Sequence, residues 1–437
     1  MIDQIFAFID SVDDIFWMYG GVTAIVMLGT YFSFKSGFFQ IRKFPAIVKN
    51  FFGYLQATGV AHQGVMPIRI FFAALGSCIG IGNLVGACTA LKLGGPGAVF
   101  WMWVTALLGC LVKYSEIYLG MKFRVKTGTS YMGGPIIYLQ HIPGYAWLAS
   151  VVAAFLCIYG VEIFIFKVIT HTLVTGWNLP MLPVVLFLLT AVFIAGQQGI
   201  RFVGKFNSVV IPVFLLLYLV LSFVVFMKNI TLLPGVIASI FVHAFSPYAV
   251  LGGATGTSLI YVISYGMRRA CYISDLGIGY ASMVHSESAE QNPGRQASTA
   301  IVEMFLDTFI LATTSMFLVL VTGVWQTDVE VFYMVPTAIA TVFPFFMYIW
   351  PLIIFLLGYL TMSAFFSVGI KAASYLFPEY GKKIYFVYAA TMFLFFSFFA
   401  QTAHAMGIMS VAGILLLICN MFGIFKLRHH IKFTLDE

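Results

Sequence analysis

The clearest shortage in this sequence is charge. Only 9% of its 437 residues are Asp, Glu, Lys or Arg, against roughly 25% in an average soluble domain. Apolar residues make up 61% of the chain and the mean hydropathy is +0.99, so a water-soluble fold would expose more apolar surface than it could bury. The composition excludes a soluble enzyme, a disordered chain and a disulfide-stapled secreted domain. It predicts an integral membrane protein.

Three other signals are missing. The six cysteines show no C-x-x-C spacing, and we expect them to be small buried residues. No basic residue precedes the first apolar run, which is the opposite of a signal-peptide start. The longest loops, 35–66 and 266–296, are too short for an added soluble domain, and no Pro-rich or Ser-rich linker divides the chain. We therefore expect one structural domain.

Long apolar runs predict about eleven membrane-spanning helices in an all-α fold. With the N-terminus outside, only Lys92 and Lys228 of the 23 basic residues fall on the outer side, and Lys113 and Lys167 fall within helices. This positive-inside bias predicts an outer N-terminus and a cytoplasmic C-terminus. The positive net charge thus reflects topology and indicates no nucleic-acid partner. The predicted spans are 15–34, 67–91, 97–121, 146–175, 181–198, 203–227, 235–264, 297–323, 345–375, 384–400 and 405–425.

Two of these spans contain helix-breaking residues. Segment 67–91 has four glycines around Asn83, and segment 235–264 has Pro247 followed by the glycine-rich run 252–256. Glycine weakens a helix in its middle, and proline removes a backbone donor. Close helix packing is the favoured explanation of a single glycine cluster, but two matched breaks favour a transport site.

The breaks divide the chain into a leading segment, 1–66, and two five-helix sets, 67–228 and 229–437. An odd number of helices per set places the two sets in opposite orientation, which is typical of an inverted-repeat secondary transporter with a central site. An unwound helix frees carbonyl groups for a small cation, and the N-terminus of a half-helix favours a carboxylate. No enzyme chemistry is needed for such a site.

The runs Gly82–Gly86 and Gly94–Trp103 resemble the signature of the alanine or glycine:cation symporters, also called the sodium:alanine symporter family. Shorter matches are Gly133–Pro135, Ala244–Pro247 and Asp307–Thr308, and the resemblance extends from about residue 20 to 425. It implies a leucine-transporter-type five-plus-five fold with one leading helix. It also implies sodium-coupled uptake of a small neutral amino acid across the plasma membrane of a prokaryote, the inner membrane in bacteria, with no cofactor besides the coupling ion.

The sequence departs from the family pattern near the presumed site. The first break, Ser77–Asn83, lacks two threonines that the family has, and Phe166 and Phe365 align with a family Gln and Trp. After the second break, Ile273–Gly277 replaces a more polar family motif. Losing one buried hydrogen-bond partner costs about 1–3 kcal/mol, enough to change substrate preference. We therefore expect a divergent member whose substrate is larger or more apolar than glycine.

The breaks and the resemblance together give a set of expected site residues. Glu162 and Asp307 enter it because charged groups inside a membrane are functional by default. For Glu162, proton coupling and a structural ion pair with a lysine remain equal alternatives; for Asp307, gating or pairing with Arg268 or Arg269 competes with simple packing. We expect substrate contacts at Gly80, Ile81, Gly82, Asn83, Phe166, Phe245, Ser246 and Phe365, and cation binding or coupling at Ile79, Thr361, Glu162 and Asp307.

Other ionisable residues are expected to be structural. Lys113 and Glu116, three residues apart, predict a local ion pair near the headgroups, and the scattered histidines show no metal-site spacing. A membrane enzyme would need acids, bases or ligands converging at one depth, and only Glu162, Lys167 and His171 are candidates. A non-transporting amino acid sensor and a proton-coupled transporter remain alternatives to a symporter. The sequence leaves the oligomeric state, the preferred amino acid and its chirality open.

Overall fold

We describe the protein from a computed structural model of the chain, which covers residues 2–57, 63–246, 259–399 and 402–436. Among these residues the only strands are β1 (Val125–Thr127) and β2 (Ser130–Met132), which pair antiparallel as a short hairpin. The rest of the regular structure is helical, which confirms the predicted all-α class.

The helices follow one another through the whole chain. They are α1 (Ile2–Ile15), η1 (Phe16–Gly21), α2 (Val22–Lys35), α3 (Phe39–Arg42), α4 (Phe44–Gln56), α5 (Pro67–Cys78), η2 (Gly82–Gly86), α6 (Ala87–Gly94), α7 (Ala98–Lys122), α8 (Pro135–Tyr138), η3 (Leu139–His141), α9 (Leu148–Tyr159), α10 (Ile163–Trp177), α11 (Met181–Gln198), α12 (Ile200–Lys228), η4 (Ile230–Leu232), α13 (Leu233–Ala244), α14 (Leu259–Ile273), α15 (Tyr280–His285), α16 (Pro293–Met304), η5 (Phe305–Ala312), α17 (Thr313–Val321), η6 (Val324–Gln326), η7 (Val331–Tyr333), α18 (Met334–Ala340), α19 (Phe346–Leu376), α20 (Gly381–Phe398), α21 (Thr402–Lys426) and η8 (Arg428–His430).

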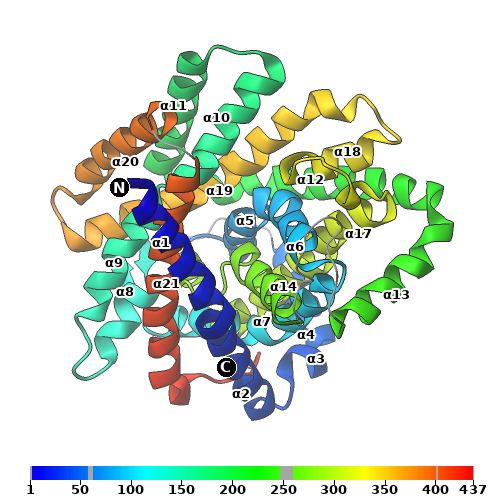
Figure 1. Cartoon of the computed structure of the whole chain (residues 1–437). Coiled ribbons are helices and arrows are strands. Elements are labelled where there is room, and N and C mark those ends of the chain that lie inside the picture. The colour runs from blue at the N-terminus through cyan, green and yellow to red at the C-terminus, as the bar shows by residue number, and fades with distance from the viewer. Residues whose placement is uncertain (1, 58–62, 247–258, 400–401, 437) are drawn as a thin grey trace.

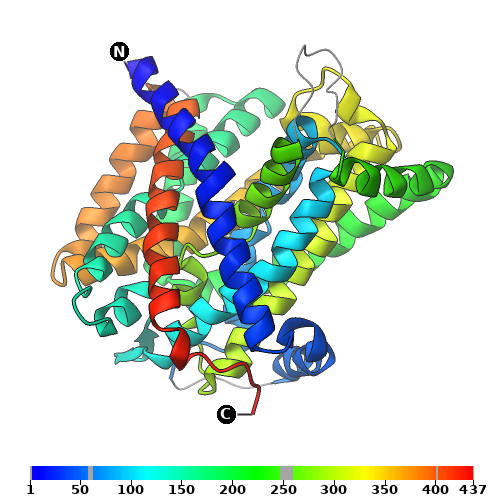
Figure 2. The same cartoon turned by 60° about the horizontal axis from the view of Figure 1, so that its bottom comes forward.

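The first and last long helices lie next to each other. α1, η1 and α2 run on without interruption, and α1 packs against α21 while η1 and α2 contact α14. Figures 1 and 2 show this pair along one side of the bundle, with the two chain ends at opposite ends of the molecule. The leading helix therefore covers one side of the central helix α14.

Helix α7 is the centre of the packing. It contacts α2, α14, α15 and α16, and its buried side chains include Lys113 and Glu116. α5 packs against α12 and α19, while α9 and α10 pack against α19 and α21. Figure 1 shows α5, α6 and α14 in the middle and α11, α13 and α20 at the rim. The ends of α5 and α14 thus meet in the interior.

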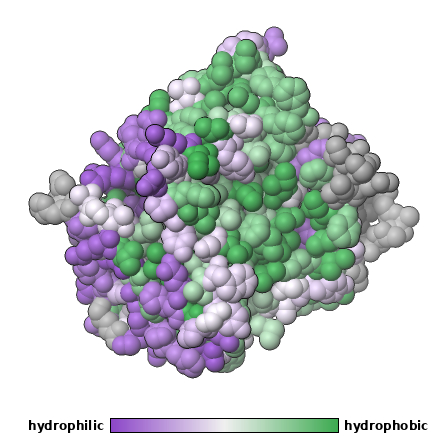
Figure 3. All heavy atoms as spheres, turned by 90° about the vertical axis from the view of Figure 1, so that its left-hand side faces the viewer, coloured by the Kyte–Doolittle hydropathy of each residue, from purple (hydrophilic) through white to green (hydrophobic). Residues whose placement is uncertain are grey.

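The rim helices expose apolar side chains where a soluble protein would carry charge. On α12, Val209, Val213, Leu216 and Phe223 are each more than half exposed. Figure 3 shows hydrophobic residues spread broadly over one face, with hydrophilic residues gathered toward one side. Lipid is the solvent that such a surface fits, since an apolar area of this extent is rare on a water-soluble monomer.

Eight helices within the described residues are long and apolar enough to cross a membrane, or nine when the bent pair Pro67–Cys78 and Gly82–Gly94 is one span. The expected number was eleven. The predicted span 235–264 consists of the short helix α13 and the start of α14, with residues outside the described part between them. α14 has only 15 residues and carries Arg268 and Arg269, so length and hydropathy do not identify it as a span.

Candidate functional site

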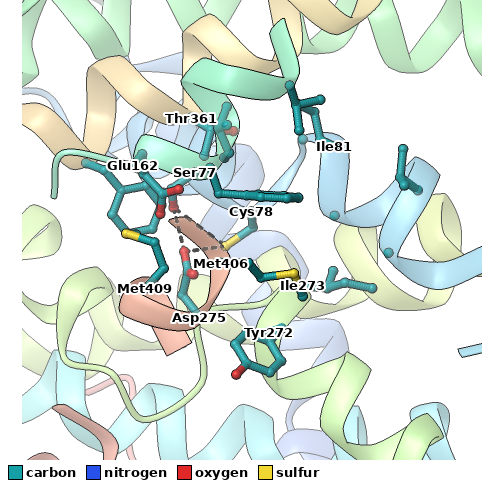
Figure 4. A pocket seen from close by; sticks show the side chains of 18 of the residues that line it. Ser77, Cys78, Ile81, Glu162, Tyr272, Ile273, Asp275, Thr361, Met406 and Met409 are labelled. Carbon is teal, nitrogen blue, oxygen red and sulfur yellow. Dashed lines mark hydrogen bonds between the residues drawn. The ribbon is translucent and has the colours of Figure 1, made fainter. Parts of the chain in front are cut away.

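A cavity of about 410 Å³ lies where α5, α9 and α14 end against η2, α10, α19 and α21. Its volume is in the range of sites that enclose small organic ligands. Figure 4 shows ten of its residues around a common space. The lining residues are Ser77, Cys78, Gly80, Ile81, Gly82, Val85, Gly86, Thr89, Tyr159, Glu162, Phe164, Ile165, Val168, Arg268, Arg269, Tyr272, Ile273, Asp275, Phe332, Thr361, Phe365, Met406, Met409 and Ser410.

The first break forms one wall of this cavity. α5 ends at Cys78, Ile79 is extended with ψ 91°, and η2–α6 leaves at 44° to α5. The amide of Gly80 donates a hydrogen bond of 3.2 Å to Asn83 Oδ1. A side chain at Gly80 has no room, because its Cβ would lie 2.6 Å from Thr361 Oγ. The break predicted from the glycines in 67–91 is confirmed.

A second break faces the first. α14 ends at Ile273, and the chain resumes as α15 at Tyr280; between them Asp275, Gly277 and Gly279 have φ of 51°, 73° and 86°. Two glycines with positive φ supply the sharp reversal that most residues resist. Ser77 Oγ at the end of α5 donates to Asp275 Oδ2 at 3.1 Å, which joins the two breaks.

The interruption expected at 244–256 falls largely outside the described residues. α13 ends at Ala244, while Pro247 and Gly252–Gly256 lie outside the described residues. Phe245 is 61% exposed and packs on Phe100, with ring centroids 5.1 Å apart. Ser246 donates to the carbonyl of Val242 in its own helix. Neither Phe245 nor Ser246 lines the cavity, while the predicted break at Pro247 and Gly252–Gly256 lies outside the described residues.

Asp307 holds the two breaks together from η5. Its Oδ1 accepts a hydrogen bond of 2.5 Å from Asn83 Nδ2, and its Oδ2 accepts one of 2.5 Å from Ser274 Oγ. Asn83 and Asp307 are almost completely buried, at 0% and 1% exposed. Asp307 therefore stands behind the cavity wall and fixes the distance between the two interrupted helices.

Arg268 does not pair with Asp307, one of the alternatives that the sequence left open. It forms ion pairs with Asp13 and Asp14 at the end of α1, the second at 2.5 Å. Asp13 also accepts a hydrogen bond from Ser410 of α21. The leading helix thus fastens α14 and α21 to each other beside the cavity.

Thr361 of α19 lies opposite the first break. Its Oγ donates to the carbonyls of Gly76 and Leu357, each at 3.1 Å. The hydroxyl therefore bridges from its own helix to the end of α5, where backbone carbonyls lose their helical partners. Ile79, the other expected cation residue beside Asp307 and Glu162, is fully buried and does not line the cavity.

A third interruption brings Glu162 into the cavity. α9 ends at Tyr159 and α10 begins at Ile163, so the predicted helix 146–175 is two helices. Glu162 has φ 52°, a costly conformation for a residue other than glycine. Its side chain is 6% exposed and, within the described residues, forms no ion pair. The alternative of a structural pair with a lysine is not observed.

The helix α10 does not place Phe166 at the cavity. Phe166 is buried and stacks on Phe393 of α20, with ring centroids 4.2 Å apart. Phe365 does line the cavity, and its ring lies 4.0 Å from that of Tyr280. Of the two aromatic residues that replace polar or larger family residues, only Phe365 of α19 lines the cavity.

A buried ion cluster underlies the cavity. Lys113 Nζ lies 3.1 Å from Glu303 Oε2 and 3.3 Å from Cys78 Sγ, and His285 Nε2 lies 2.9 Å from Glu303 Oε1. The predicted local pair of Lys113 with Glu116 near the headgroups is wrong. Glu116 instead accepts hydrogen bonds from the Gly279 amide at 3.1 Å and from Asn420 Nδ2 at 2.8 Å.

The structure thus sorts the expected site residues into three groups. Gly80, Ile81, Gly82, Glu162, Thr361 and Phe365 line the cavity; Ile79, Asn83 and Asp307 stand behind it; Phe166, Phe245 and Ser246 lie away from it. Sequence reasoning did not assign Asp275 or Arg269 to the site, although the spacing Asp275-x-Gly277-x-Gly279 at a helix end was a usable signal. No group of three or more His, Cys, Asp or Glu in the described part of the chain could hold a metal ion.

These features define a multi-pass membrane protein with a central ligand cavity between interrupted helices, the architecture of a transporter. The family model described as the sodium:alanine symporter family matches residues 2–437. The chain belongs to this family, as the signature in its sequence indicated. It is a membrane transporter and not an enzyme.

Curated relatives agree with this assignment. An uncharacterized transporter of Haemophilus influenzae is 34% identical over 73% of this chain and 70% of its own length. The amino-acid carrier protein AlsT of Bacillus subtilis is 31% identical over 69% of this chain and 63% of its own length. The sodium/alanine symporter AgcS of Methanococcus maripaludis is 29% identical over 72% of this chain and 70% of its own length.

Proposed function

We propose that this protein is a secondary active symporter that imports an amino acid together with sodium. The observation that carries the proposal is the meeting of two interrupted helices, α5–η2 and α14–α15, at one cavity where Asp307 ties their breaks together. Interrupted helices at a central site are how secondary transporters bind an ion and a substrate without dedicated cofactors. The family membership and the names of the relatives AgcS and AlsT support the same activity.

In this proposal the two sides of the first break bind different ligands. The N-terminus of η2, at Ile81 and Gly82, presents amide groups that attract the substrate carboxylate. The Thr361 hydroxyl and the carbonyls at the end of α5 near Ile79 offer oxygen ligands for sodium. Asn83 and Asp307 hold both sites in register. The leucine-transporter-type five-plus-five arrangement, with 67–228 and 229–437 as the two repeats after 1–66, is part of the proposal.

The first substrate to test is alanine, in keeping with the name of the relative AgcS. The membrane is proposed to be the plasma membrane, with an outer N-terminus and a cytoplasmic C-terminus, because the basic residues favour that orientation. Proton coupling is the second candidate, since Glu162 is a buried carboxyl group in the cavity with no ion pair among the described residues.

Uptake by proteoliposomes tests this function. We expect labelled alanine to accumulate above equilibrium under an inward sodium gradient and to remain at equilibrium without sodium. Thr361→Val should raise the sodium concentration for half-maximal uptake at least tenfold, because it removes an oxygen ligand. Thr391→Val is the matched control and should leave the sodium dependence unchanged. Like Thr361, Thr391 donates a hydrogen bond to the carbonyl four residues earlier, at 2.9 Å, but it lies on an exposed stretch of α20.

Other outcomes assign other functions. Accumulation driven by a proton gradient alone, and lost in Glu162→Gln, would replace sodium with proton coupling. Binding of amino acids without uptake or counterflow exchange would indicate a sensor. An unchanged sodium dependence in Thr361→Val would remove Thr361 from the cation site.

A further inference from the structure

Four charged side chains line the cavity, and only one of them is neutralised by protein. Arg268 pairs with Asp13 and Asp14. Arg269, Glu162 and Asp275 line the cavity but form no ion pair with any described residue. These three groups therefore face the cavity without an ion-pair partner among the described residues, and Glu162 is the carboxylate with no hydrogen bond from them either.

The carboxylate of Glu162 is the group most in need of a partner. Its side chain is 94% removed from solvent, since only 6% is exposed, and no described residue hydrogen-bonds to it. A buried carboxylate without a partner is costly, so its position in a cavity wall points to a ligand. Asp275 accepts hydrogen bonds from Ser77 at 3.1 Å and Cys78 at 3.7 Å, neither of which carries a positive charge.

The positive and the negative side chains lie in different parts of the cavity. Arg269 lies beside η2, where a Cβ on Gly86 would be 2.7 Å from its guanidinium. Asp275 lies beyond the end of α14, in the turn that follows Ile273. Figure 4 shows Glu162 and Asp275 on the side of the cavity away from Ile81 of the first break, with their carboxylates turned toward the common space.

Apolar side chains fill the interval between these poles. Ile81 and Ile273 stand on one side, and Phe365, Met406 and Met409 complete the wall. Such a wall fits an aliphatic chain, and methionine adapts to chains of different shape. A carboxylate at one end, an alkyl chain between and an ammonium at the other end would satisfy every uncompensated group.

We propose that the preferred substrate is an amino acid with a basic side chain, whose carboxylate lies between Arg269 and the start of η2 and whose side-chain ammonium lies between Glu162 and Asp275. This inference rests on the proposed function, because it names the substrate of the same cavity.

Equilibrium binding to the purified full-length protein in detergent tests this proposal without a gradient. Labelled lysine and labelled alanine are each bound in sodium buffer. Unlabelled lysine, alanine or norleucine, which has the chain of lysine without the ammonium group, then competes with each label. We expect lysine to bind at least tenfold more tightly than norleucine. Equal or tighter binding of norleucine would overturn the proposal, whatever any variant shows.

Substitution of Glu162 locates the interaction. Glu162→Gln should weaken lysine binding at least tenfold and leave norleucine within about twofold, since only the ammonium loses its partner. Glu379→Gln, in the exposed turn before α20, is the control. It also removes a carboxylate, and we expect it to leave the binding of both ligands unchanged. Melting temperature and elution profile show that each variant is folded. An equal loss for both ligands in folded Glu162→Gln would assign Glu162 a role other than binding the ammonium.

The outcomes also separate this inference from the proposed function. If alanine binds and lysine does not, the transporter assignment stands and the basic substrate is wrong. If no amino acid binds to folded protein, both are wrong.

Discussion

At the residue scale, the least expected feature is the fully buried cluster of Lys113, Glu303 and His285. Lys113 and Glu303 are 1% and 0% exposed. Removing one member of a buried pair leaves an uncompensated charge and costs about 3–5 kcal/mol, although replacing both by apolar groups is often harmless. Lys113 also touches Cys78 of the cavity wall, so the cluster supports the floor of the site.

This cluster gives a stability prediction. Glu303→Gln should lower the free energy of unfolding by about 3–5 kcal/mol, because Lys113 then stays buried without its counter-ion. The double variant Lys113→Met with Glu303→Met should be more stable than Glu303→Gln alone. Thermal melting in detergent, followed by tryptophan fluorescence, measures both. Additive losses in the double-variant cycle would show that Lys113 and Glu303 contribute independently.

At the element scale, the first break was predictable and the other two were not. Four glycines and Asn83 in 67–91 weaken a helix by local propensity alone, and the chain bends there. The break at Glu162 has only Gly160 as a local signal. It is imposed by packing, because a Cβ on Gly160 would lie 2.8 Å from Tyr385 OH and 2.9 Å from the carbonyl of Phe365. Contacts between distant segments are not visible in one sequence.

The turn at 274–279 was not predicted either. Pro247 and the glycines after it are strong local signals, so they drew attention away from 274–279. The decisive residues there, Asp275, Gly277 and Gly279, lie in a segment less hydrophobic than its neighbours, which hydropathy assigns to a loop. The hydrogen bond between Ser77 and Asp275 joins segments 198 residues apart, and such contacts are not visible in one sequence.

Helix contact at the start of α5, the end away from the first break, gives a prediction at this scale. α5 and α12 approach closely at Gly204, where a Cβ would lie 2.3 Å from the carbonyl oxygen of Arg69. Gly204→Ala should force the helices apart and lower the melting temperature, with a loss of about 1–3 kcal/mol for an overpacked contact. Gly235→Ala in α13 is the control, because nothing lies within 4 Å of its Cβ position. Equal melting temperatures for both variants would contradict the close packing.

At the scale of the whole molecule, composition alone identified the class. Low charge and high hydropathy predicted a membrane bundle, and the described helices agree. The number of spans was less predictable, because α14 carries two charged residues. Arg268 pairs with Asp13 of α1, and Arg269 lines the cavity. Charged residues that function requires inside a bundle lower the mean hydropathy of the helix that carries them. Such a helix is then not identified as a span.

The orientation of the bundle is the last prediction, and it depends on where basic residues gather. Leu179, between α10 and α11, is 39% exposed and should face outward; Lys382, at the start of α20 beside Lys383, is exposed and should face the cytoplasm. A membrane-impermeant maleimide should therefore label Leu179→Cys in intact cells and Lys382→Cys only after permeabilisation. The unmodified chain is the control, because its six native cysteines are buried or half-buried. Labelling in the reverse order would mean that the opposite orientation is correct, with the N-terminus in the cytoplasm. It would also show that the bias in basic residues does not orient this fold.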